Sequence, residues 1–288
     1  MLIAHPSPSV LGPALRLSLF ACLAAALALG AGAAQAQTAL RLATTTSTQN
    51  SGVLDDLLPR FESERGIKVH VIAVGTGKAL ELGAQGDVDM VMVHAPDLEL
   101  DYVGKGAFIE RTPVMFNEFV ILGPPADPAR VRESGNIAEA MRRIALGRAP
   151  FISRGDRSGT HIKEQELWKA AGIEPVGSWY QQVGQGMGAT LRIAHERQSY
   201  TLSDDGTYFA FESGLELKIL SRREPLLVNP YAVMLVNPAR HPHVHARAAR
   251  ELVQWLASEH GQSLIGDYVK HGHRLFTPGL PPEMRTAR

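Results

Sequence analysis

Short apolar runs alternate with segments of helical spacing along most of this chain, and that alternation restricts the fold more than any other feature of the sequence. Residues 39–43 form an apolar run typical of a buried strand, and residues 50–65 carry apolar side chains at helical spacing until Gly66. Strands connected by helices in this way form a mostly parallel sheet with helices on its faces. The alternation therefore predicts an α/β protein.

The same pattern continues to residue 257. The further predicted strands lie at residues 67–74, 88–93, 119–122, 150–153 and 231–236, and one more ends near Leu202. The further predicted helices lie at residues 78–84, 96–105, 137–146, 159–171, 189–197 and 244–257. In α/β folds, ligands bind at the carboxyl ends of strands and between domains, which is where the turns from strand to helix lie.

Two breaks in the pattern divide the chain into two lobes. Residues 123–128 read Gly-Pro-Pro-Ala-Asp-Pro, which interrupts any helix or strand, and residues 222–225 are the predicted return crossing. Residues 37–123 and 225–288 then form the first lobe, and residues 124–224 form the second. The roughly 250 residues after the N-terminal segment are enough for two such lobes. We expect the ligand to lie between them.

Residues 1–36 have the pattern of a cleaved secretory signal peptide. They contain no acidic side chain, Arg16 precedes an apolar run at residues 17–29, and the segment ends in Ala34-Gln35-Ala36. The apolar run is shorter than the roughly 20 residues that a membrane span needs. We therefore expect an exported, periplasmic protein. The alternatives are a retained membrane anchor and a lipid-modified Cys22.

Cysteine content and charge exclude several classes of function. Cys22 is the only cysteine, so the chain after residue 36 contains no disulfide, no cysteine nucleophile and no thiolate metal site. The full chain has 29 Lys and Arg residues and 29 Asp and Glu residues. Removal of the signal peptide takes away one arginine and leaves a net charge near −1. Because no basic field results, we expect no nucleic-acid partner.

The first turn with binding chemistry is a run of five hydroxyl side chains at residues 44–48, between a predicted strand and a predicted helix. Helix N-termini attract anions because unpaired N–H groups point outward there and the helix dipole is positive. We therefore predict that Thr45, Thr46 and Ser47 bind an anion. The alternative is simple helix capping, which needs only one of these hydroxyls. Gly75 and Thr76 occupy the same position one unit later, where glycine permits close backbone approach.

The third turn follows the predicted strand at residues 150–153. Arg154 supplies a planar guanidinium that matches oxyanion geometry. The start of the next helix adds hydroxyl and N–H donors from Ser158, Gly159 and Thr160. Asp156 either holds an arginine in place or accepts a proton from a protonated anion. The alternative is a capped helix with a surface Arg–Asp pair.

Two further turns are weaker candidates. Residues 184–190 are rich in glycine but miss the dinucleotide fingerprint, because the third glycine comes one residue too early. Gly188 and Arg192 are secondary candidates for ligand contact, and close packing of the helix is the alternative. The turn at residues 203–207 is another candidate for lining the pocket.

Two further groups of residues raise the alternatives of a metal site and a hydrolase site. His241, His243 and His245 share one face of an extended segment, but Pro242 marks a loop that leads into a helix, so we expect surface histidines and no metal. Ser158 has a histidine within one helical turn but no third orienting carboxylate. We therefore expect no enzyme activity and no cofactor.

Five segments, in chain order, resemble the tungstate-binding proteins of bacterial tungstate ABC transporters: residues 43–52, 74–80, 87–91, 153–161 and 184–188. The resemblance covers about residues 40–270. It implies a two-lobed type II periplasmic-binding-protein fold that closes on a dianion without a metal or covalent chemistry. It also implies a monomeric solute-binding component that serves a membrane permease and a cytoplasmic ATPase. The implied contacts are Thr45 and Thr76 from one lobe and Arg154 and Thr160 from the other.

Phosphate and organic solutes stay open as alternative ligands. Phosphate-binding proteins of the same fold have the spacing seen from Arg154 to Thr160. Phosphate near neutral pH keeps a proton and needs an acceptor such as Asp156, whereas fully ionised tungstate or molybdate needs donors only. The hydroxyl-rich first turn favours tungstate. An organic solute needs apolar or aromatic walls, and these turns contain almost no aromatic residue.

Overall fold

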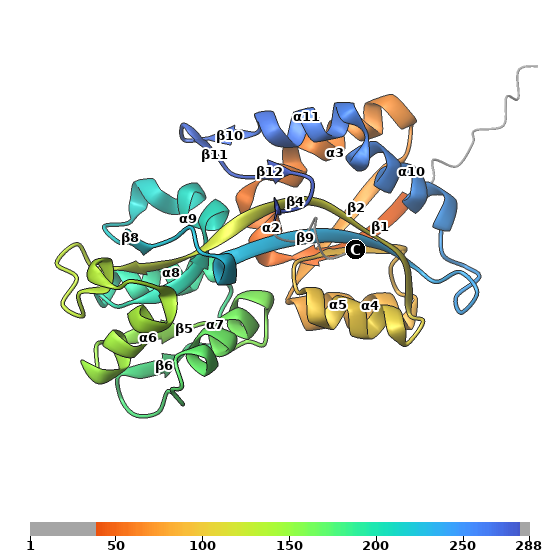
Figure 1. The fold of residues 1–288 in the computed structure, drawn as a ribbon. Helices are drawn as coiled ribbons and strands as arrows, with labels where there is room; N and C mark the ends of the chain where they lie inside the picture. Colours follow the sequence, from red (N-terminus) through yellow and green to blue (C-terminus); the bar gives the residue numbers. More distant parts are fainter. Residues whose placement is uncertain (1–38, 283–288) are drawn as a thin grey trace, which may run out of the picture. The chain divides into compact units, whose positions relative to one another are not determined.

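The structure is a computed structural model of the chain, and it describes residues 39–282. The predicted signal peptide at residues 1–36, with Cys22, lies outside the described residues. Figure 1 shows two lobes connected by the strands β4 (Phe108–Gly123) and β9 (Val228–Val236). The predicted α/β fold class is confirmed.

The first lobe is built on parallel strands. β1 (Ala39–Thr45) lies between β2 (Lys68–Val74) and β3 (Met90–Val93) and is parallel to both. β9 pairs antiparallel with β3, and the full strand order is β12-β4-β9-β3-β1-β2, where β12 is Thr277–Pro278. The helices of this lobe are α2 (Thr46–Ser51), α3 (Val53–Arg65), α4 (Thr76–Gln85), α5 (Pro96–Gly104), α10 (Ala246–Ala257) and α11 (Glu259–Asp267).

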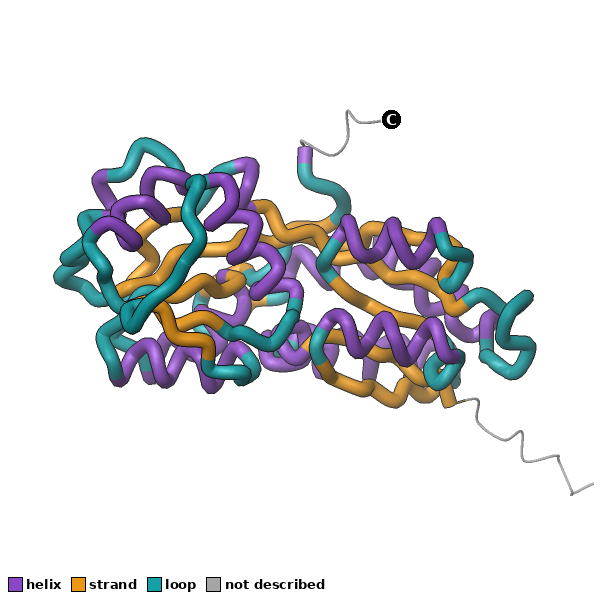
Figure 2. Tube along the Cα trace, turned by 90° about the horizontal axis from the view of Figure 1, so that it is seen from below, coloured by secondary structure: helices purple, strands orange, loops and turns teal. Residues whose placement is uncertain are grey.

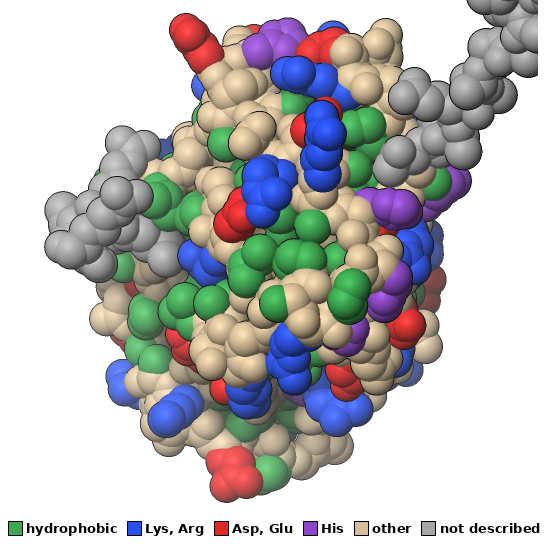
Figure 3. Space-filling model, turned by 90° about the vertical axis from the view of Figure 1, so that its right-hand side faces the viewer, with side chains coloured by type: hydrophobic (Ala, Val, Ile, Leu, Met, Phe, Trp, Pro, Cys, Tyr) green, Lys and Arg blue, Asp and Glu red, His purple; other side chains and the backbone are tan. Residues whose placement is uncertain are grey.

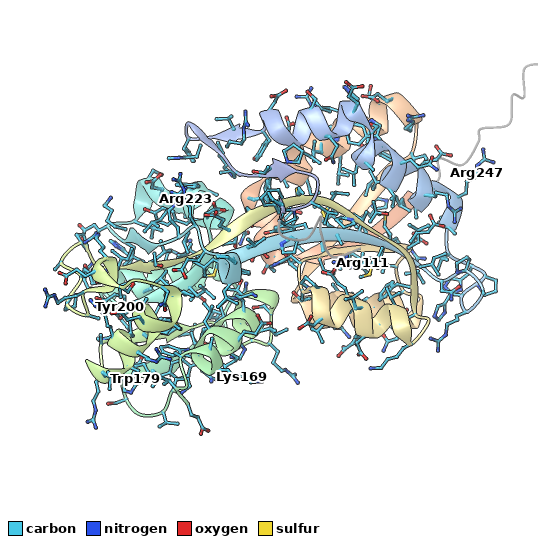
Figure 4. All side chains as sticks on the ribbon, viewed as in Figure 1. Arg111, Lys169, Trp179, Tyr200, Arg223 and Arg247 are labelled. Carbon is cyan, nitrogen blue, oxygen red and sulfur yellow. The ribbon has the colours of Figure 1, made fainter. Side chains whose placement is uncertain are left out.

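Helices cover both faces of this sheet because successive strand residues point to opposite sides. Leu42 and Met92 pack into the core formed with α3 and α10, whereas Ala43 and Val91 pack into the core formed with α4 and α5. Figure 1 shows α3 and α11 above the sheet and α4 and α5 below it. Arg111 extends from β4 toward α5 and pairs with the buried Glu99 at 2.6 Å (Figure 4).

The two long strands carry the chain between the lobes. From Phe108 to Glu118, β4 pairs antiparallel with β9. From Phe119 onward it pairs antiparallel with β7 (Thr201–Asp204) and β8 (Lys218–Ser221). The change of partner therefore lies inside a continuous strand, ahead of the Gly-Pro-Pro segment where the sequence placed the crossing.

The second lobe surrounds the far half of β4 (Figure 1), and Figure 2 shows strands flanked by helices in both lobes. Its other strands, β5 (Phe151–Ser153) and β6 (Tyr180–Gln182), are parallel to each other. Its helices are α6 (Ile137–Leu146), α7 (Gly159–Ala170), α8 (Met187–Glu196) and α9 (Asp205–Phe211), with single 3₁₀ turns at Val131–Glu133, Glu212–Gly214 and Pro225–Leu227. Tyr200 and Trp179, labelled in Figure 4, belong to the aromatic part of its core.

Each predicted strand and helix overlaps an observed element of the same type, but one predicted helix is divided into two. The predicted helix at residues 50–65 is two helices, because Gly52 adopts a φ of +80° between α2 and α3. A side chain there is strained by the backbone, and its Cβ would lie 2.8 Å from Tyr268 Oη. Tyr268 caps the end of α11, and Lys270 lies in the hairpin of β10 (Val269–Lys270) and β11 (His273–Arg274); both donate hydrogen bonds to Ser51 O.

Between residues 39 and 282, no helix combines the length and the apolar character that crossing a membrane requires. On the face shown in Figure 3, basic and acidic side chains are interspersed. This mixture agrees with the balanced charge of the sequence.

Candidate oxyanion-binding site

Three of the predicted turns meet between the lobes. The turns after β1 and β2 start α2 and α4 in the first lobe, and the turn after β5 leads to α7 in the second. Arg154 Nη1 donates a hydrogen bond to Ser47 Oγ at 3.2 Å, and Gly159 N donates to Thr76 Oγ1 at 2.9 Å. The two lobes therefore contact each other directly through residues that the sequence singled out.

These polar residues are almost completely buried. Thr45, Ser47, Thr76, Arg154, Ser158 and Thr160 are each at most 3% exposed. A buried guanidinium is costly unless a counterion and hydrogen bonds satisfy it. Arg154 Nη2 donates to Asp156 Oδ2 at 2.6 Å, which supplies that counterion.

Three buried donors at this junction are unused. Thr46 Oγ1, Arg154 Nε and Thr160 Oγ1 have no hydrogen-bond partner among the described residues. Most buried polar groups in proteins are paired, so three unpaired ones at one junction point to a missing acceptor. The N-termini of α4 and α7 add outward-facing N–H groups and positive dipole ends. A small group with acceptors only, such as an oxyanion, matches this set.

Asp156 of the third turn is hydrogen-bonded to its neighbours, whereas the buried Asp204 Oδ2 has no partner among the described residues. Asp156 Oδ2 accepts from Arg154, and Oδ1 accepts from Ser158 N at 3.1 Å. Burial alone would raise the pKa of Asp156, but Arg154 and the hydrogen bonds from Ser158 outweigh it, so this pKa lies below its usual value. Asp156 is therefore an ionised partner of Arg154 at neutral pH.

A further buried residue at this junction was missed by the sequence analysis. His94 follows β3 and is 3% exposed, and its Nε2 lies 3.2 Å from Thr45 Oγ1. Burial lowers the pKa of His94 to about 4, although the Asp204 charge and the hydrogen bond with Asn229 oppose this shift; the Arg154 charge adds a smaller lowering. The position was recognisable, because His94 stands at the carboxyl end of a strand as the predicted turns do. A lone histidine after an apolar run carries no other signal.

A model of the PBP superfamily domain matches residues 31–260. The chain belongs to the PBP superfamily. It is 43% identical over 236 residues to the tungstate-binding protein TupA of Peptoclostridium acidaminophilum, which covers 81% of this chain and 82% of that protein. The chain therefore also belongs to the family of that protein.

Two solved structures of this superfamily are similar to the chain. The structure of the tungstate ABC transporter from Geobacter sulfurreducens is 50% identical with a TM-score of 0.75, and covers 80% of this chain and 98% of that one. The tungstate-binding protein TupA from Desulfovibrio alaskensis G20 is 45% identical with a TM-score of 0.74, and covers 85% of this chain and 100% of that one. The resemblance stated from the sequence is confirmed, and so is the two-lobed fold that it implied.

The turns of the weaker candidates adjoin the first turn: Thr207 Oγ1 donates to Ser47 O at 3.5 Å, and a Cβ on Gly186 would lie 3.7 Å from Thr46 Oγ1. A Cβ on Gly188 would lie 2.8 Å from the Phe211 ring, so this glycine allows α8 to pack on α9. The exposed Arg192 guanidinium is 6.0 Å from the centre of the same ring. Asp204 Oδ1 accepts from Thr207 N at 2.8 Å and caps α9. Gly75 belongs to the second of the three main turns: it caps α4, and a Cβ there would meet nothing within 4 Å.

The three histidines near residue 243 take part in backbone contacts. His241 Nε2 and His243 Nε2 each lie 2.9 Å from a carbonyl oxygen at the end of α4, on Ala84 and Gly86 respectively. His245 N donates to Asp89 Oδ1 at 2.9 Å. Within residues 39–282, no group of three or more His, Cys, Asp or Glu side chains is arranged to hold a metal ion.

Glu164 lies buried one turn after Thr160, and its raised pKa predicts that the stability of the fold depends on pH. It accepts from Tyr180 Oη at 2.7 Å and from Trp168 Nε1 at 3.1 Å, and burial raises its pKa to about 7. Because the folded-state pKa lies above the unfolded value, ionisation destabilises the fold as pH rises from about 4.5 to 7. We expect Glu164→Gln to raise stability at pH 8 by on the order of 1–3 kcal/mol and to change it little at pH 4.5.

Thermal unfolding at both pH values measures this effect. Glu166→Gln on the exposed side of the same helix is the control, and it should show no such pH-dependent gain. Equal destabilisation of Glu164→Gln at both pH values would mean that the folded protein needs the ionised carboxylate.

Proposed function

We propose that this protein is the solute-binding component of an ABC importer and that it binds tungstate between its lobes. The observation that carries the proposal is the set of unpaired buried donors on Thr46, Arg154 and Thr160. The names of the related tungstate-binding proteins support the same ligand. They also agree with the expectation of a binding protein and not an enzyme.

The proposed contacts come from both lobes. In the first lobe they are the hydroxyls of Thr46, Ser47 and Thr76 and the backbone at Gly75. In the second lobe they are the Arg154 guanidinium, the hydroxyls of Ser158 and Thr160, and Gly159, whose N–H donates to Thr76 Oγ1 in this structure and would exchange that acceptor for the anion. We keep residues 37–123 with 225–288 and residues 124–224 as the two proposed lobes. Closure of the lobes around the anion would present one surface to the permease.

Asp156 holds Arg154 in place, and each of its carboxylate oxygens accepts one hydrogen bond within the protein and keeps one further lone pair. The choice of tungstate over phosphate therefore rests on the unpaired buried donors and on the names of the related tungstate-binding proteins. A fully ionised tetrahedral anion needs donors only. Tungstate and molybdate share this property, with nearly the same size and charge, and both remain within the proposal. The few aromatic residues at the three turns argue against an organic solute.

Export and partners belong to the same proposal. The predicted signal peptide at residues 1–36 would deliver the protein to the periplasm, where it would act as a monomer. Its partners would be a membrane permease and a cytoplasmic ATPase. No cofactor is required, because binding rests on hydrogen bonds and charge alone.

Calorimetric titration tests the ligand directly. The chain without residues 1–36 is titrated with tungstate, molybdate, sulfate and phosphate in parallel. Each charge-assisted hydrogen bond contributes about 1.5–3 kcal/mol, so several converging on one dianion should yield dissociation constants of about nanomolar for tungstate. Sulfate is the matched control, as a smaller tetrahedral dianion, and should bind more weakly. Phosphate binding more tightly than tungstate would overturn the proposal.

A further inference from the structure

His94 contacts both lobes at the candidate site. Its ring stacks on Tyr231 of β9 with a centroid distance of 4.6 Å. Its opposite contact is Gly159 at the start of α7, where an added Cβ would lie 3.0 Å from His94 Cε1. His94 also lines a cavity of about 300 Å³ between α5 and α7. The ring therefore lies where the second lobe approaches the first.

The hydrogen bonds around Asn229 determine which nitrogen of His94 carries the proton. Asn229 Nδ2 donates to Asn117 Oδ1 at 2.8 Å and lies 3.1 Å from Tyr231 Oη. The amide oxygen of Asn229 is thereby turned toward His94 Nδ1, at 2.9 Å. A carbonyl oxygen only accepts hydrogen bonds, so Nδ1 must carry the hydrogen.

The other nitrogen then receives the hydroxyl proton of Thr45. Burial outweighs the charge of the nearby Asp204 and lowers the pKa of His94 to about 4, so the ring is neutral at neutral pH and Nε2 offers a lone pair. Thr45 Oγ1 lies 3.2 Å from Nε2 and donates to it. The same oxygen accepts from Thr48 N at 3.2 Å and lies 2.8 Å from Thr48 Oγ1. Thr45 is thus the cap of α2, and its hydroxyl proton is not free for an anion.

This chain of hydrogen bonds begins at the strands that connect the lobes. Asn117 of β4 and Asn229 of β9 are directly opposite each other in the ladder, one residue before the last pair, Glu118 and Val228. The bonds therefore extend from the crossing strands through His94 to the first residue before α2.

We propose that His94 is the positioning residue of the oxyanion site: it accepts the Thr45 hydroxyl proton, and so holds the first turn of α2 with Thr46 and Ser47 facing the second lobe. The inference rests on the proposed function, since it assumes that this turn binds the anion. This role differs from simple packing of the ring, because it depends on the lone pair of His94 Nε2 that accepts the Thr45 hydroxyl proton.

Three substitutions of His94 distinguish the role of its hydrogen-bond acceptor from the role of its ring shape. Gln places an amide oxygen near the position of Nε2, Asn places an amide nitrogen near Nδ1, and Phe keeps only the ring shape. We expect His94→Gln to keep tungstate affinity within about threefold, and His94→Asn and His94→Phe to weaken it about tenfold or more, as for loss of one buried hydrogen bond. Equal losses in all three variants, or no loss in any, would contradict the inference.

Two measurements on the ligand-free protein test the positioning role of His94 independently of tungstate. Nitrogen-15 NMR of the imidazole should show a neutral ring protonated on Nδ1 at pH 7, and an Nε2-protonated or charged ring would overturn the inference. Amide exchange of Thr48 should accelerate in His94→Phe and stay slow in His94→Gln. If the wild type bound no tungstate while both results held, the proposed function would fail and the positioning role would stand.

Discussion

Replacing Arg154 by alanine is expected to weaken tungstate binding by about a hundredfold or more. One charge-assisted hydrogen bond alone accounts for about ten- to a hundredfold. The variant also leaves the half-buried carboxylate of Asp156 without its cation, and that charge then repels the dianion. Titration calorimetry of the variant beside the wild type measures the loss.

The matched control is Arg157→Gln. Arg157 lies three residues further along the same loop, is exposed, and carries the same charge. The control should keep tungstate affinity within about threefold, since exposed charges contribute little. If both variants bound equally well, Arg154 would not contact the anion and the proposed site would be wrong.

Replacing Gly159 by valine is also expected to weaken tungstate binding strongly, because the larger side chain would keep the two lobes apart. A Cβ at this position would lie 3.0 Å from His94 Cε1 and 3.2 Å from Thr76 Oγ1, both in the other lobe. The added methyl groups would keep α7 away from α4, so the donors could not converge on one anion. We expect about tenfold weaker binding for Gly159→Ala and about a hundredfold for Gly159→Val, measured by calorimetry.

Thermal unfolding without ligand separates this effect from misfolding. Neither variant should be strongly destabilised, because the obstructed contact lies between lobes and not inside a core. Gly104→Ala is the control, since a Cβ there meets nothing within 4 Å. Unchanged affinity of Gly159→Val would show that the lobes do not approach at this point when the anion is bound.

The three main turns were predictable because each combines a strand end, a helix start and an unusual density of hydroxyls or glycine. Local sequence encodes all of these features. The free state of Thr46 and Thr160 was not predictable, because it depends on which side chains of the other lobe reach them. The same holds for Thr45, whose hydroxyl is used by a histidine 49 residues away.

The crossing strands were only half predicted. Residues 119–122 are uniformly apolar and were recognised, but residues 108–118 include Glu110, Arg111 and Pro113, which break any apolar or alternating pattern. That part of β4 is stabilised by its pairing with β9, more than a hundred residues later in the chain. Pairing over such a separation leaves no local signature, so the sequence placed the crossing at the nearest strong turn signal instead.

The pairing of Glu118 with Val228 has a consequence for how such proteins diversify. Residues 119–227, between this pair, amount to a single insertion in a hairpin, and they contain the whole of the second lobe proposed at residues 124–224. A recombination event that exchanges this insertion would replace Arg154, Gly159 and Thr160 together and leave the sheet of the first lobe intact. Half of the proposed binding site would thereby be inherited as a unit, which can be exchanged while the other half keeps its geometry.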